Sequence, residues 1–105
     1  MDPEMLNALA EPNRLRIVEL LREGPYSVGE IAARVPVSQP QVSKHLKVLN
    51  DAGIVTVQPV AQRRIYRLRR AAFTELDSWV DSFHSTWEGR LDMMESAIKE
   101  MRDKS

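Results

Sequence analysis

Apolar residues recur at helical spacing through the first part of the chain, and prolines and a glycine divide them into segments. Pro3 and Pro12 each suit the first turn of a helix, where the missing amide proton costs no hydrogen bond. Gly24 and Pro25 together form a typical stop signal after a helix. The pattern therefore predicts one short helix over residues 3–10 and a second that starts at Pro12 and ends before Gly24.

Two capping signals follow, with a tight turn between them. Ser27 and Ser38 each precede a Glu or a Gln by three residues, the spacing at which two side chains bond each other's backbone amides at a helix start. Pro40 lies inside the first turn that Ser38 opens. The helices expected from these signals cover residues 28–34 and 39–51, with a turn at residues 35–37 between them.

Beyond Gly53 the hydrophobic period changes twice. β-Branched and aromatic residues fill residues 54–58 and 63–68, which predicts a hairpin whose loop holds Pro59. After the hairpin, proline is absent and apolar residues recur every three or four positions. We therefore expect one long helix over residues 71–103, about 45–50 Å in length.

This order of elements predicts a winged helix-turn-helix domain. The expected fold is mainly α with a small β-hairpin, in the order α-α-α-α-β-β-α, and it forms one domain over residues 1–105. Within it we place the helix-turn-helix at residues 27–51, the wing at residues 54–68 and a C-terminal dimerisation helix at residues 71–103.

Charge is unevenly distributed along the chain, although the formal net charge is +0. Residues 38–70 contain seven Lys and Arg against a single acidic residue, Asp51, whereas acidic residues are in excess on both sides. A phosphate backbone is bound by a locally basic surface, whatever the overall charge. The middle third is therefore the candidate surface for DNA.

The helix at residues 39–51 has two distinct faces. Val42, Leu46 and Leu49 fall within about 60° of one another on a helical wheel and are expected to face the core. The opposite face is polar and basic, with glutamine, serine and lysine side chains that suit base edges or phosphate in the major groove. The expected DNA contacts on this helix are Ser38, Gln39, Gln41, Ser43, Lys44 and Lys47, with Lys47 on a backbone phosphate.

In the hairpin, five arginines follow the expected loop, and strand alternation prevents all of them from facing DNA. Arg63 and Arg64 are nearest the tip, so we expect them to contact phosphate or the minor groove. Arg67, Arg69 and Arg70 are equally compatible with a solvated or intramolecular ion-pair set.

The long C-terminal helix carries an apolar surface too wide for a small monomer to cover, which indicates a twofold dimer. We expect leucines of the first helix to join this interface. The residues assigned to it are Leu6, Leu9, Leu76, Trp79, Val80, Phe83, Trp87, Leu91, Met94 and Ile98. A ligand pocket between the two tryptophans is the alternative use of this surface.

Specific stretches carry a resemblance to a known family. The chain resembles the ArsR family of bacterial repressors, in particular its metal-independent, autorepressor-like (SdpR-like) subgroup, in ALAEPNRLRIVELL, YSVGEIAARVPVSQPQVSKHLKVLNDAGIV and QRRIYRL. The C-terminal FTELDSWVDSFHSTWEGRLDMMESAIKE is also similar to that subgroup's last helix. The resemblance implies a homodimeric transcription repressor on a palindromic operator. It also implies dimerisation through the first and last helices, a recognition helix from Gln39 to Asn50 in the major groove, and a wing at Pro59 to Arg64.

Other chemistries find little support in this sequence. The chain has no cysteine and two histidines, His45 and His84, whereas a stable metal site needs three or four ligands. We therefore expect no metal and no cofactor, His45 as a packed imidazole at the helix edge, and His84 as a surface or interface residue. No nucleophile with a positioned base and no glycine-rich phosphate loop is present, so we expect no enzyme.

The remaining alternatives concern partners and location. A winged helix used only for protein interaction is the main rival, and it predicts no salt-dependent DNA affinity. No apolar stretch approaches the roughly 18 residues that cross a bilayer, and the start lacks a basic segment followed by an apolar run. We expect a cytoplasmic protein without membrane contact, and the pattern identifies no effector.

Overall fold

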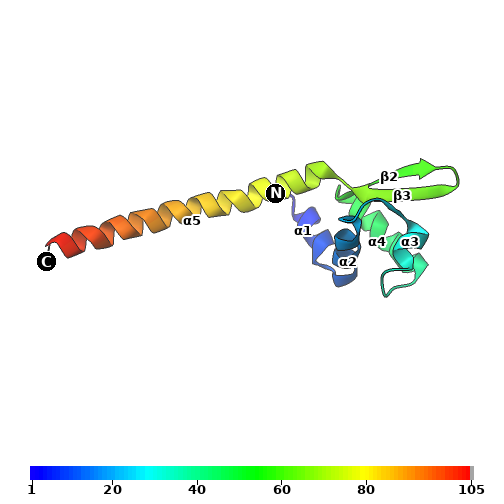
Figure 1. Ribbon diagram of the computed structural model, residues 1–105, viewed down its shortest axis with the longest axis horizontal. Coiled ribbons are helices and arrows are strands. Elements are labelled where there is room, and N and C mark those ends of the chain that lie inside the picture. The colour runs from blue at the N-terminus through cyan, green and yellow to red at the C-terminus, as the bar shows by residue number, and fades with distance from the viewer. Residues whose placement is uncertain (105) are drawn as a thin grey trace. The chain divides into compact units, whose positions relative to one another are not determined.

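In the described part of the chain, helices and strands follow one another in the predicted order α-α-α-α-β-β-α, with one further short strand between the second and third helices (Figure 1). The computed structural model describes residues 1–104, apart from the side chains at positions 88 and 104. The elements are α1 (Pro3–Ala10), α2 (Pro12–Leu21), β1 (Tyr26–Ser27), α3 (Val28–Ala32), α4 (Gln39–Asp51), β2 (Val55–Val60), β3 (Arg63–Leu68) and α5 (Arg70–Lys104).

The chain divides into two units, Met1–Phe73 and Thr74–Ser105. The first unit contains every element except the greater part of α5, and it holds the buried core. The second unit consists of the rest of that helix. Among the described residues, none of the helices combines the length and the hydropathy needed to span a bilayer.

Side-chain caps stabilise the first turns of α1 and α2. The Glu4 amide donates to Asp2 Oδ1 at 3.0 Å, and the Arg14 amide donates to Glu11 Oε2 at 2.8 Å. The Arg14 Nε group also donates to the Ala8 carbonyl at 2.7 Å, which ties the end of α1 to the start of α2. The helix predicted over residues 3–10 is confirmed.

The capping box at α3 forms as predicted. The Glu30 amide donates to Ser27 Oγ at 3.2 Å, and the Ser27 amide donates to Glu30 Oε1 at 2.9 Å. The helix ends at Ala32, two residues earlier than expected. The Arg34 amide bonds the Ile31 carbonyl three residues back, and Val35 precedes a proline, which disfavours further helix.

A third strand that the sequence analysis missed completes the sheet. The strand order is β1-β3-β2, with Tyr26 opposite Tyr66 and Ser27 opposite Ile65. The expected two-stranded hairpin is therefore the larger part of a three-stranded antiparallel sheet. A segment of two residues is too short to show the alternation of apolar and polar side chains that predicts a strand. β1 forms because the neighbouring strand offers it a free edge.

Pro59 lies in β2 opposite Arg64, and not in the hairpin loop as expected. The loop consists of Ala61 and Gln62, and Ala61 has a positive φ of 55°. With a two-residue loop, the pair that flanks it is hydrogen-bonded and the next pair is not. Pro59 occupies that next pair on an edge strand, so its missing amide proton costs no ladder bond.

The core of the first unit is built from all three predicted core positions of α4 and from the other helices and strands. Val42, Leu46 and Leu49 are fully buried, which confirms the assignment of that helix face. Ile17 of α2 and Ile31 of α3 are buried with them. Burial of one face of α4 leaves its other face in contact with solvent.

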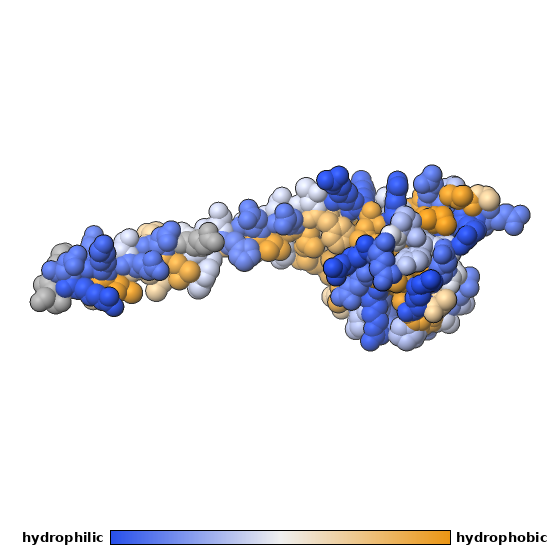
Figure 2. All heavy atoms as spheres, in the orientation of Figure 1, coloured by the Kyte–Doolittle hydropathy of each residue, from blue (hydrophilic) through white to orange (hydrophobic). Residues whose placement is uncertain are grey.

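Hydrophobic side chains remain exposed along the second unit, where Figure 2 shows them between hydrophilic ones. Phe83, Trp87 and Met94 are each 60–61% exposed. Trp79 and Phe83 pack edge to face with ring centroids 5.1 Å apart. The long helix expected over residues 71–103 is confirmed and has 35 residues, from Arg70 to Lys104.

Candidate nucleic-acid interface

The exposed face of α4, with the N-cap Ser38, carries the polar residues of this helix that were assigned to DNA. At its start, the Ser38 amide donates to Gln41 Oε1 at 3.4 Å. This bond uses one of the two lone pairs on the Gln41 amide oxygen and neither of the hydrogens on its nitrogen. All six residues assigned to DNA at this helix are exposed: Ser38, Gln39, Gln41, Ser43, Lys44 and Lys47.

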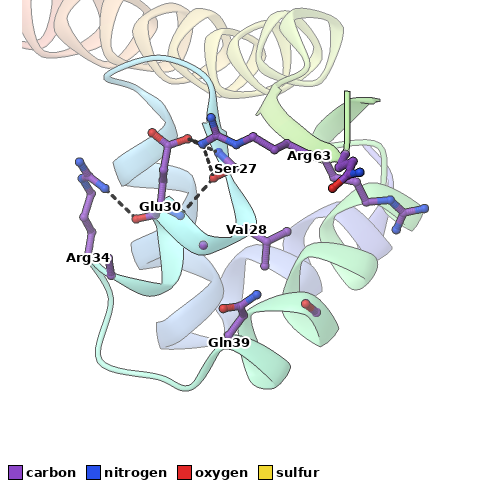
Figure 3. Close-up of a pocket in the computed structure, with 11 residues that line it drawn as sticks. Ser27, Val28, Glu30, Arg34, Gln39 and Arg63 are labelled. Atoms are coloured by element: carbon purple, nitrogen blue, oxygen red, sulfur yellow. Dashed lines mark hydrogen bonds and ion pairs between the residues drawn. The ribbon is translucent and has the colours of Figure 1, made fainter. Parts of the chain in front are cut away.

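A hollow of about 670 Å³ lies between α3, the first half of α4 and the wing (Figure 3). Four expected contact residues line it together, although they are up to 25 positions apart in the sequence: Gln39, Ser43, Arg63 and Arg64. Ser38, Gln41, Lys44 and Lys47 are not among its lining residues. Other residues that were not assigned to DNA also line the hollow, among them Ser27, Glu30, Arg34 and Gln62.

Arg63 lies at the edge of this hollow with its guanidinium group already paired. Its Nη2 atom donates to Glu30 Oε1 at 2.8 Å and to Ser27 Oγ at 3.1 Å. Hydrogen bonds from the Ser27 amide and hydroxyl lower the pKa of Glu30 from its ordinary value, and the nearby arginine charges lower it further. The Glu30 carboxylate is therefore a stable anionic partner for Arg63.

The other arginines near the interface differ in their contacts. Arg64 forms no hydrogen bond or ion pair with the part of the chain that the structure describes. Arg67 Nε donates across the hairpin to Thr56 Oγ1 at 3.4 Å. Arg34 of the turn after α3 donates to the Glu30 carbonyl at 2.9 Å and lies over the Tyr26 ring, 4.8 Å from its centroid. The capping boxes and their spacing in the sequence did not predict these contacts.

The two histidines lie in different settings. His45 Nδ1 is 3.8 Å from Glu11 Oε2, and the side chains are 19% and 30% exposed, so the imidazole packs at the edge of α4 as expected. The amide of Arg14 lowers the pKa of Glu11, and the His45 and Arg14 charges add to this. His84 lines a shallow hollow along α5 with Phe83, Thr86, Trp87 and Arg90. Among the described residues, no three His, Cys, Asp or Glu side chains are placed to hold a metal ion.

Comparison with known proteins identifies the family. The model of the bacterial regulatory protein family arsR matches residues 4–57, which include both helices of the helix-turn-helix. The chain belongs to the ArsR family. As a member of this family, it is a DNA-binding transcriptional regulator and not an enzyme.

Several named relatives resemble this ArsR-family chain. It is 46% identical over 76 residues to the HTH-type transcriptional regulator Rv2034 of Mycobacterium tuberculosis, covering 72% of this chain and 71% of the relative. It is 42% identical over 64 residues to the biofilm growth-associated repressor of Agrobacterium fabrum, covering 61% of this chain and 55% of that protein. The transcriptional repressor SdpR of Bacillus subtilis is 28% identical over 79 residues, covering 75% of this chain and 88% of SdpR.

Solved structures of ArsR-type proteins share the fold. An ArsR-like transcriptional regulator from Rhodococcus sp. RHA1 has a TM-score of 0.77 and 26% identity, covering 89% of this chain and 88% of its own. The homodimeric winged helix-turn-helix DNA-binding domain of Mb0332 from Mycobacterium bovis has a TM-score of 0.65 and 27% identity. The match covers 78% of this chain and 76% of that one. The winged helix-turn-helix assigned from the order of elements is confirmed.

Proposed function

We propose that this ArsR-family chain represses transcription by binding a palindromic operator as a homodimer. The observation that carries the proposal is the hollow that Gln39 and Ser43 of α4 line together with two arginines of the wing. Several relatives are named repressors, and one structural neighbour is described as homodimeric. Because bacterial DNA lies in the cytoplasm, we assign the chain to that compartment.

In this proposal α4 enters the major groove with its exposed face toward the bases. Glutamine suits adenine, serine accepts or donates to several bases, and lysine suits guanine or phosphate. We assign base contacts to Gln39, Gln41, Ser43 and Lys44, and backbone contacts to Ser38 and Lys47. At the wing, Arg64 has its guanidinium available for phosphate or the minor groove, whereas Arg63 is engaged by Glu30.

The proposed dimer uses the first and last helices. Exposed apolar residues recur every three or four positions along α5, which is the pattern of a helix that packs against another helix. Leu6 and Leu9 of α1 are half-buried, and Leu9 packs partly against the core of its own unit. The proposed contacts from α5 are Leu76, Trp79, Val80, Phe83, Trp87, Leu91, Met94 and Ile98.

A selection experiment tests the function. The purified chain is used to select duplexes from a random-sequence pool, and affinity for the selected duplex is then measured against salt concentration beside a random duplex. We expect enrichment of an inverted repeat, tighter binding to the selected duplex, and log affinity that falls linearly with log salt. No enrichment together with salt-independent binding would exclude the proposal and favour a winged helix used only for protein contacts.

A further inference from the structure

The far end of the wing has little support from the rest of the first unit. β1 pairs only with Ile65 and Tyr66 of β3, so it ends before the wing tip. β2 and β3 continue as a two-stranded ribbon to the Val60–Arg63 pair, and residues 58–64 are all exposed. An isolated two-stranded hairpin is marginally stable in water. The position of the wing tip therefore depends on side-chain contacts that reach back to the helices.

Arg63 makes such a contact with α3. Its Nη2 atom bonds Glu30 Oε1 and Ser27 Oγ at 2.8 and 3.1 Å. Both acceptors are already held in place, because Ser27 and Glu30 also bond each other's backbone amides in the capping box. Figure 3 shows the Arg63 side chain extending from the wing to this pair. The guanidinium thus meets a preformed acceptor site 33 and 36 positions away in the sequence.

The charges around Arg63 and Arg64 favour different roles for the two residues. A phosphate on Arg63 would approach the Glu30 carboxylate, which lies 2.8 Å from the same guanidinium nitrogen, and like charges repel. Arg64 is the next residue of β3, so its side chain leaves the strand on the opposite side from that of Arg63, although both residues line the hollow. It has no acidic partner in the described part of the chain.

We propose that Arg63 is a positioning residue, whose ion pair with Glu30 sets the place of the wing relative to the first half of α4, while Arg64 makes the wing's contact with the DNA backbone. The inference rests on the proposed DNA-binding function. Gln39 and Ser43 line the same hollow as Gln62 and Arg64. A shift of the wing therefore changes the spacing between the base-reading groups and the backbone-binding group.

A double-mutant cycle on DNA affinity tests this role. The variants are Arg63→Ala, Glu30→Gln and the two together, measured on the selected duplex at several salt concentrations. Glutamine at position 30 keeps the capping box, because Gln serves at that position as Glu does. We expect each single change to weaken binding about two- to fivefold, as loss of an exposed ion pair would allow, and the double change to be no weaker than the worse single one.

The salt slope separates positioning from direct contact. We expect Arg63→Ala to leave the slope of log affinity against log salt unchanged. Arg64→Ala should reduce it by about 1.8, because each of the two protomers loses one phosphate contact worth about 0.9 on duplex DNA. The proposal is overturned if Arg63→Ala flattens the slope as Arg64→Ala does while Glu30→Gln leaves binding unchanged or tighter. That result would mean that Glu30 competes with phosphate for Arg63.

A distance measurement tests the positioning role without DNA. Because the chain has no cysteine, Ala33→Cys and Gln62→Cys place spin labels only on the turn after α3 and on the wing loop. An excess of unlabelled chain keeps one labelled copy in each dimer. We expect Arg63→Ala and Glu30→Gln to shift or broaden the distance distribution, and Arg64→Ala to leave it unchanged. An unaltered distribution in the first two variants refutes the inference, even when the protein binds DNA.

Discussion

Arg63 and Arg64 are neighbours in the sequence, but their guanidinium groups meet different surroundings. Arg63 pairs with Glu30, whereas Arg64 lacks a partner among the described residues. Consecutive side chains leave a strand on opposite sides, which is why we propose different roles for these two adjacent arginines. On α4 the corresponding difference is between residues suited to bases and residues suited to phosphate.

At this scale we predict that the polar residues of α4 determine sequence preference. Gln39→Ala and Lys44→Ala should each weaken binding to the selected duplex by about 1–3 kcal/mol and to a random duplex by less, because base contacts are lost. Lys47→Ala is the matched control, and it should weaken both duplexes equally. Fluorescence anisotropy titrations on the two duplexes measure this. The assignment is wrong if the α4 variants keep full preference while Arg64→Ala alone changes it.

Lowering the pH should destabilise the folded state, because Glu30 becomes protonated. Its pKa is lowered in the fold, chiefly by the Ser27 hydrogen bonds, so its contribution to stability is present above the ordinary carboxyl pKa. That contribution is lost as pH falls through the lowered value. Urea unfolding at a series of acidic pH values should therefore show a shallower loss of stability for Glu30→Gln than for the native chain. Parallel losses in the two chains would contradict this assignment.

Helix α4 has one buried face and one exposed face. Val42, Leu46 and Leu49 are fully buried, and the polar residues opposite them are exposed. The capping signal at Ser38 and the turn before it set where the helix begins, so they also set which residues reach the surface. The place of the loop also decides whether β2 can contain a proline. It puts Pro59 in a pair that is not hydrogen-bonded, on an edge strand, where the missing amide proton costs no bond.

A pair of substitutions on adjacent positions of α4 tests the separation of its faces. Leu46→Ala removes a fully buried side chain and should lower the free energy of unfolding by about 2–5 kcal/mol. Lys47→Ala changes an exposed residue on the same turn and should alter stability by no more than about 0.5 kcal/mol. Urea denaturation of both variants gives the comparison. Similar losses in the two variants would mean that the helix is not buried on the face assigned to it.

For the whole molecule, the second unit presents an apolar surface that the described residues leave exposed. Trp87 is 61% exposed and Leu91 is 38% exposed. A surface of this kind on a soluble monomer favours association, and a twofold dimer covers the same patch on both copies. We therefore propose that α5 acts on function through the oligomeric state.

We predict that charges on this surface of α5 prevent dimerisation. Trp87→Glu with Leu91→Glu should yield monomers or aggregates, because buried unpaired carboxylates are costly. Ser85→Glu with Ser96→Glu adds the same charge on the opposite side of the helix wheel and should leave the dimer intact. Sedimentation velocity at tens of micromolar protein measures the outcome. A native chain that sediments as a monomer at that concentration would remove the proposal.

Metal ions should not alter DNA binding by this chain. It contains no cysteine and two histidines, and they lie at positions 45 and 84 on different helices. Three or four ligands are needed for a stable site of the zinc type. Zinc, cadmium or nickel at modest excess should leave affinity for the selected duplex unchanged in anisotropy titrations. A chelator-reversible loss of binding at stoichiometric metal would show that a site exists.

Much of the fold and part of the site follow from local signals in the sequence. The helices at residues 3–10 and 39–51, the capping box at Ser27 and the buried face of α4 were all predicted correctly. These features depend on residues within a few positions of one another, so spacing alone reveals them. The family resemblance rests on the same stretches.

Tertiary structure decided the features that join distant segments. β1 is a strand only because β3 lies beside it, and Pro59 is tolerated only because β2 is an edge strand. The expected DNA contact of Arg63 followed from its place near the loop, whereas the pairing of its guanidinium with Glu30 and Ser27, 33 and 36 positions earlier, is visible only in the fold. The period of hydrophobic and polar residues in the sequence specifies which side of a helix or strand a residue occupies. The partner it meets there depends on how separate elements pack, because that packing is set by the core and not by neighbours in the chain.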